Sequence, residues 1–152
     1  MENLLKESQL NSLQLNQKAT AFLKEISKWT YFLSILGFVG IGFMVILAFS
    51  MGAIMSALPM GEAYGAAAMM GGGAFFTVFY LLMALLYFFP VYYLYKFSVN
   101  LKASLASSND EELANAFEYL KSHYKFIGIL SIILIGFYVL IFLFAGLGAA
   151  FM

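Results

Sequence analysis

Three long apolar stretches alternate with polar segments along the chain. Residues 30–58, 74–96 and 126–151 consist almost entirely of aliphatic, aromatic and small side chains. Each has about 20 or more residues, which at about 1.5 Å per residue of helix crosses the roughly 30 Å hydrocarbon core of a bilayer. The pattern predicts an all-α integral membrane protein with three transmembrane helices, forming a single membrane domain over residues 1–152.

The polar segment before the first apolar stretch has a helical pattern of its own. In residues 1–29 the apolar positions follow one another at intervals of four and three, which places them on one face of a helix. This predicts an amphipathic N-terminal helix on the cytoplasmic side, and its balanced charges favour packing against other helices over anchoring on the membrane surface. The predicted face comprises Leu15, Ala19, Phe22, Ile26 and Trp29.

The polar and apolar pattern of residues 97–125 predicts a cytoplasmic helical hairpin that extends the second and third transmembrane helices. A helix start is indicated at its centre, where either Ser108 with Glu111 or Asn109 with Glu112 has the spacing of a capping box. Apolar residues recur at helical spacing on both sides of this turn and should meet as the hairpin core. The predicted core residues are Phe97, Leu101, Leu105, Leu113, Phe117, Leu120 and Tyr124.

Small residues and a proline interrupt the apolar spans. Glycines in the first and third spans predict positions where another helix approaches closely, because small residues serve as packing positions in lipid. Packing within the chain is the favoured interpretation, and a homo-oligomer seam is the alternative. In the second span Pro90 removes one helix hydrogen bond, which predicts a kink. The glycines are Gly37, Gly40, Gly42, Gly128 and Gly136.

Residues 59–73 are rich in glycine and contain a proline, which predicts an external loop. Methionines gather at this end of the chain, and soft thioethers can bind Cu(I). Because the chain has no cysteine and no histidine nearby, a flexible loop lying along the membrane is favoured, while Cu(I) binding stays open. The methionines are Met51, Met55, Met60, Met69 and Met70.

Composition supports the membrane class and excludes one kind of partner. The chain is 63% hydrophobic and 11% charged, with a mean hydropathy of +0.89, whereas soluble domains are about 45 to 50% apolar and about 25% charged. The lipid bilayer is therefore the expected surrounding. The formal net charge is zero, which leaves no basic surface of the kind that recognises nucleic acid.

The lysines predict the orientation of the chain. All of them lie before the first span, at the last residue of the second span, or between the second and third spans, and short lysine-rich flanks stay in the cytoplasm. We expect a multi-pass membrane protein with its N-terminus cytoplasmic and its C-terminus outside. The lysines are Lys6, Lys18, Lys24, Lys28, Lys96, Lys102, Lys121 and Lys125.

The sequence offers little chemistry for catalysis. The interiors of the three spans contain no ionisable side chain, which disfavours an ion-coupled carrier. His123 stands alone between Lys121 and Lys125, and a lone histidine is more often solvated or packed than a metal ligand. No phosphate-binding loop and no catalytic constellation stands out. We therefore expect a non-enzyme that has no catalytic residue, cofactor or metal site.

Two classes of function fit this sequence. The first is a structural or accessory membrane protein that presents its cytoplasmic helical bundle to a membrane-complex partner or to a second copy of itself. The alternative is a homo-oligomeric pore or passive carrier for a small neutral or apolar solute, since backbone carbonyls and hydrophobic constrictions can line a path without charged residues. Partner, oligomeric state and any solute are left open by the sequence.

Four segments resemble a known family. They are residues 26–29, running into the glycine-spaced first span, and residues 93–97, 108–121 and 126–130. Together they resemble a family of small bacterial inner-membrane proteins that is classed as a domain of unknown function, over about residues 20 to 150. The resemblance implies a bacterial source and three membrane helices, and it brings no activity or catalytic residue with it.

The predicted orientation can be tested with single cysteines, because the chain has none of its own. Cysteines are placed at Ala67 and at Ser107, and intact cells are treated with a membrane-impermeant thiol reagent. We expect labelling at position 67 only, since position 107 should face the cytoplasm. Labelling at position 107 without labelling at position 67 would show that the orientation is reversed.

Overall fold

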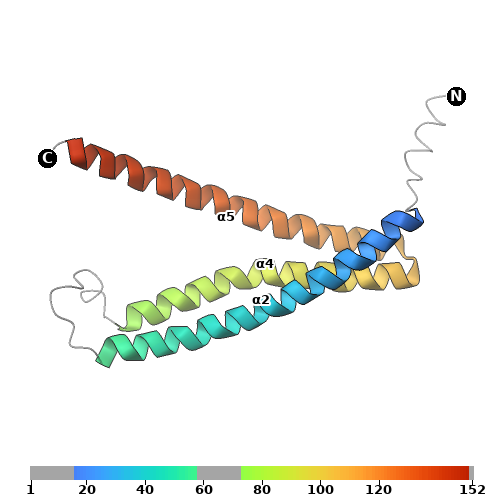
Figure 1. Cartoon of the computed structure of the whole chain (residues 1–152), viewed down its shortest axis with the longest axis horizontal. Helices are drawn as coiled ribbons and strands as arrows, with labels where there is room; N and C mark the ends of the chain where they lie inside the picture. Colours follow the sequence, from blue (N-terminus) through green and yellow to red (C-terminus); the bar gives the residue numbers. More distant parts are fainter. Residues whose placement is uncertain (1–15, 58–72, 151–152) are drawn as a thin grey trace.

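A computed structural model describes residues 16–57 and 73–150, except the side chains of residues 55, 56 and 145–150. The described residues form three helices: α2 (Gln17–Ala57), α4 (Gly73–Ser107) and α5 (Asp110–Ala150) (Figure 1). All three are long and apolar enough to cross a membrane. The predictions of an all-helical fold and of three helices suited to membrane crossing are confirmed for the described residues.

The helix α4 is the element that both other helices pack against. It runs beside α2 along much of its length, and it contacts α5 in the part of the molecule near their connection (Figure 1). Towards its C-terminal end α5 moves away from the α2–α4 pair. From Ser131 to Phe144 every residue of α5 is exposed. The chain is therefore a helix pair with a third helix attached at one end.

The helix α2 is continuous across the boundary at which the sequence suggested two segments. Asn16 caps its start, since the Asn16 Oδ1 atom accepts a hydrogen bond of 2.7 Å from the backbone N–H of Ala19. From Gln17 onward, the expected N-terminal helix and the expected first span form one helix without a break. Residues 1–15, including Leu15 of the predicted apolar face, lie outside the described residues.

The side of α2 that packs in the molecule differs from the predicted apolar face. Phe22, Ile26 and Trp29 are 56%, 43% and 60% exposed, whereas Ser27 and Ser34 are buried. Small side chains allow two helix backbones to approach closely, and this advantage outweighs side-chain size in selecting the packed side. The buried hydroxyls donate to carbonyls of their own helix, from Ser27 to Lys24 at 2.8 Å and from Ser34 to Tyr31 at 2.7 Å.

Contacts along the pair fix the register of α2 against α4. The rings of Tyr31 and Tyr95 have centroids 5.9 Å apart, and Phe38 lies at the same distance from Phe88. Near the other end, the Thr77 hydroxyl donates to the Ala48 carbonyl at 3.1 Å. These pairs show that the helices are antiparallel and remain level with each other over their apolar stretches.

Of the glycines predicted to mediate packing, Gly37 lies at a close approach between helices. A Cβ atom built there would stand 2.8 Å and 2.9 Å from the two γ-carbons of Val91. Gly52, which the sequence pattern did not single out, would meet the Thr77 hydroxyl in the same way. The other four, Gly40, Gly42, Gly128 and Gly136, have no such neighbour within 4 Å among the described residues. The favoured prediction of packing within the chain is therefore not met at these four, and the alternative of a seam between copies stays a prediction.

The expected loop over residues 59–73 falls almost wholly outside the described residues. Only Gly73 is described, and it is the first residue of α4. Of the methionine cluster, Met51 is part of α2, whereas Met60, Met69, Met70 and the side chain of Met55 lie outside the description. Binding of Cu(I) by these methionines therefore stays an alternative that only the sequence suggests.

Two glycine substitutions on α2 should have different effects on stability. Gly37→Leu forces the β-branched Val91 aside and should cost about 1 to 3 kcal/mol of unfolding free energy, as overpacking typically does. Gly40→Leu adds the same side chain where space is open and replaces a poor helix former, so stability should stay the same or rise slightly. Melting temperatures in detergent would report both. Equal losses for the two variants would contradict the described contact.

Candidate functional site: a polar groove on the α4–α5 hairpin

A small buried core holds the hairpin together. Phe97 and Leu101 of α4 are 1% and 0% exposed, and Ala116 of α5 is fully buried against them. The structure thus brings together five of the seven predicted core residues, namely Phe97, Leu101, Leu105, Leu113 and Leu120. Partly buried residues around the core include Leu23 from α2, so all three helices contribute to it.

The other two predicted core residues lie elsewhere. Phe117 is 45% exposed and Tyr124 is 65% exposed. The side of α5 that faces the core passes through Leu113, Ala116 and Leu120, and residue 117 stands one helical step of about 100° away from Ala116. The sequence prediction assigned Phe117 to the core because of its size. Its neighbour Ala116 makes the contact instead, because a small side chain allows the two helices to approach closely. The Phe117 ring still touches Phe97, with centroids 6.2 Å apart.

The turn between the helices is set by two residues, Ser108 and Asn109. Ser108 has a positive φ of 53°, the left-handed conformation that commonly follows the end of a helix. The N–H of Asn109 donates to the Ser104 carbonyl at 3.2 Å. This six-to-one bond is that of a Schellman motif and satisfies one of the free carbonyls at the end of α4.

Asn109 also caps the start of α5, and this resolves the two capping alternatives. Its Oδ1 atom accepts hydrogen bonds from the N–H groups of Glu111 at 2.9 Å and Glu112 at 3.4 Å. In a capping box the Glu112 carboxylate would also accept a bond from the N–H of Asn109. Here that N–H donates to the Ser104 carbonyl in the Schellman motif. The Glu112 carboxylate instead accepts a bond of 3.0 Å from the Ser107 hydroxyl.

A histidine joins α5 to the middle of α4. The Nδ1 atom of His123 lies 2.7 Å from the carbonyl oxygen of Pro90. Since a carbonyl only accepts, Nδ1 carries the proton of this bond. Pro90 is buried inside α4, which continues as a helix on both sides of it. The kink expected at Pro90 stays a prediction, whereas His123 has a packing role.

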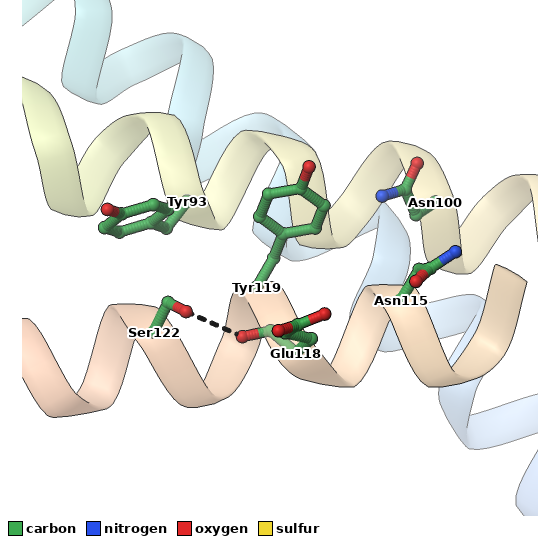
Figure 2. A pocket seen from close by; sticks show the side chains of 6 residues that line it. All are labelled: Tyr93, Asn100, Asn115, Glu118, Tyr119 and Ser122. Atoms are coloured by element: carbon green, nitrogen blue, oxygen red, sulfur yellow. Dashed lines mark hydrogen bonds between the residues drawn. The ribbon is translucent and has the colours of Figure 1, made fainter.

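Beside the core, polar side chains from α4 and α5 line an open groove of about 420 Å³ (Figure 2). Two lie on α4, seven residues apart, and four lie on α5 at helical spacing. Figure 2 shows that the two asparagines lie near each other and that the Tyr119 ring stands between the helices. The lining residues are Tyr93, Asn100, Asn115, Glu118, Tyr119 and Ser122.

The groove offers hydrogen-bonding groups and one negative charge. The Ser122 hydroxyl donates to the backbone carbonyl of Glu118 at 2.9 Å, so this bond does not occupy the Glu118 carboxylate. None of the lining residues is a lysine, which makes the groove a better site for a cation or a neutral polar group than for an anion. Among the described residues no group of three metal-ligating side chains comes together.

The comparison with protein families concerns this part of the chain. A family described as "Family of unknown function (DUF5362)" matches residues 60–146, which is more than half of the 152 residues. The chain belongs to this family. No curated protein and no solved structure matches it.

The DUF5362 match contains the whole groove and leaves out α2. It spans α4 and most of α5, including the core residues Phe97, Leu101 and Ala116. The resemblance inferred from sequence, to a family of unknown function, is confirmed over a shorter range than expected, since residues 20 to 59 fall outside the match. A bacterial source and an inner-membrane location stay predictions.

The sequence pattern did not single out the groove of this DUF5362 protein. A signal was present, because Tyr93 and Asn100 are seven residues apart, and Asn115, Glu118 and Ser122 follow at intervals of three and four. Each set forms a polar stripe next to the apolar stripe of the same helix. The register that brings the two stripes together depends on the turn at Ser108 and Asn109, which spacing alone does not give.

The core can be tested by a pair of phenylalanine substitutions. Phe97→Ala empties a buried site and should cost about 3 to 5 kcal/mol of unfolding free energy. Phe117→Ala removes a half-exposed ring and should cost only about 1 kcal/mol. Thermal unfolding of both variants in the same detergent gives the comparison. A loss at Phe117 as large as that at Phe97 would contradict the described packing.

Proposed function

We propose that the protein is a non-enzymatic structural or accessory protein of the bacterial inner membrane, whose cytoplasmic hairpin docks a partner protein or a second copy of the chain. In this proposal α2, α4 and α5 cross the bilayer, with the N-terminus in the cytoplasm and the C-terminus outside. The lysines at the hairpin end of all three helices support this orientation.

One observation carries the docking proposal. The Phe117 ring packs against the buried Phe97 ring, yet it is 45% exposed. A ring that already packs on a buried core has less conformational freedom to lose on binding, and aromatic side chains are enriched in protein interfaces. The hairpin around it is fixed by the Asn109 cap and by the bond between His123 and Pro90. A rigid surface with an exposed aromatic ring is suited to recognition.

The membrane part of α5 favours the same class of function. Its described side chains from Ser131 to Phe144 are all exposed, with Phe142 reaching 81%. Between helices in lipid the association energy comes from packing and interhelical hydrogen bonds, because lipid tails are as apolar as the side chains. A helix that makes few contacts within its own chain is therefore available to a neighbouring protein without breaking any packing.

Photo-crosslinking in native membranes tests the proposal. A benzophenone amino acid replaces Phe117 in one variant and Phe43, which is 62% exposed on the membrane part of α2, in a control variant. We expect protein adducts from position 117 and chiefly lipid adducts from position 43. The mass of the adduct distinguishes a second copy from a different protein.

The pore or passive-carrier alternative gives a different result in this experiment. A ring of identical subunits would place membrane positions between copies, so position 43 would form a ladder of adducts with multiples of the chain mass. Absence of protein adducts from position 117, with efficient lipid adducts from position 43, would overturn the docking proposal.

A further inference from the structure

The groove lies at the level where α2 and α4 leave their charge-free stretches. On α2 that stretch begins after Lys28, and on α4 it ends before Lys96. The contact between Tyr31 and Tyr95 places these two ends side by side. Of the groove residues on α4, Tyr93 lies on one side of Lys96 and Asn100 on the other. Given the membrane placement proposed above, on which this inference rests, the groove lies at the depth of the lipid headgroups.

On α5, charged residues extend further towards the interior of the proposed membrane than they do on α2 and α4. The Phe126 ring lies 5.9 Å from that of Phe89. The adjacent Lys125 is therefore level with about Pro90, which is five residues, or about 7.5 Å, further into the membrane than Tyr95. A lysine at such a depth extends its side chain towards polar groups at the surface of the bilayer. Lipid phosphate is the polar group that this position meets first.

One face of α5 presents opposite charges in a defined order. Glu118, Ser122 and Lys125 are separated by four and three residues and share a face, and Lys121 lies one turn from Glu118. From the water side inward, this face offers a carboxylate, then ammonium groups, and then the exposed apolar residues of α5. A zwitterionic phospholipid offers the complementary order of an ammonium, a phosphate and acyl chains.

We propose that the groove binds the headgroup of a phospholipid that carries a primary ammonium, as phosphatidylethanolamine does. The Glu118 carboxylate accepts hydrogen bonds from the ammonium, and the tyrosine rings add cation–π attraction. The amide oxygens of Asn100 and Asn115 provide further acceptors. Lys121 and Lys125 interact with the phosphate, and the acyl chains lie along the apolar part of α5. A groove of about 420 Å³ is within the size range of small-ligand sites.

The test compares two lipids that differ only in the headgroup. The purified full-length protein is mixed in detergent with phosphatidylethanolamine or phosphatidylglycerol of identical acyl chains, and bound lipid is measured by native mass spectrometry and by the melting temperature. We expect tighter binding of phosphatidylethanolamine. Equal binding of the two lipids would overturn the proposal.

Matched variants locate the site. Glu118→Gln keeps the size of an exposed side chain, removes its charge, and should weaken phosphatidylethanolamine binding about tenfold while leaving phosphatidylglycerol binding unchanged. Glu25→Gln makes the same change at an exposed position of α2 outside the groove and should have no effect. Lys125→Gln should weaken both lipids, because both carry the phosphate. An unchanged lipid preference in Glu118→Gln would overturn the assignment.

Two further controls separate the possible failures. If free phosphoethanolamine raises the melting temperature as much as the lipid does, the ligand is a soluble amine and the lipid source is wrong. Alkaline carbonate extraction of cell membranes tests the membrane placement by itself. A chain that is released by carbonate contradicts the proposed function, whereas a retained chain that binds both lipids equally contradicts only the headgroup site.

Discussion

The close contact between α2 and α4 is the constraint on which the rest of the structure depends. It requires small side chains along one stripe of α2, where Ser27, Ser34 and Ala48 are buried and Gly37 meets Val91. Serine is tolerated there because each hydroxyl bonds to a carbonyl of its own helix. Among the described residues every buried side-chain oxygen or nitrogen has a partner. The side chains of this stripe are therefore small enough for the two helices to approach closely. None of their polar groups is buried without a hydrogen bond.

The same preference for small residues explains where the sequence pattern succeeded and where it failed. The helical class, the three helices of membrane-crossing length and the turn at Asn109 could be predicted, since they depend on local apolar length and capping chemistry. The packed faces were harder to predict, because Phe22 and Phe117 suggested burial by their size, whereas Ser27 and Ala116 are the residues in contact. Hydrophobic periodicity marks one side of a helix, but neighbouring residues lie only about 100° apart, so it does not decide which of two neighbours makes the contact.

The groove shows a second limit of sequence reasoning. Its residues come from two helices, and no spacing within one helix shows which residues of the other will lie opposite. The left-handed conformation of Ser108 and the bond between His123 and Pro90 set that register. Only then do Asn100 and Asn115 come together. The polar stripe on each helix can be predicted, whereas the groove is a property of the pair.

The two-residue turn between α4 and α5 also has a consequence for the order of folding. Bringing two chain segments together costs entropy that grows with the length of the loop between them. The bonds of the turn link residues at most five apart, from Ser104 to Asn109 and from Ser107 to Glu112, whereas Tyr31 and Tyr95 are separated by most of two helices. We therefore expect the hairpin to close from its turn outward as soon as the first turns of α5 have formed, ahead of the contacts that α2 makes with α4 and with the hairpin core.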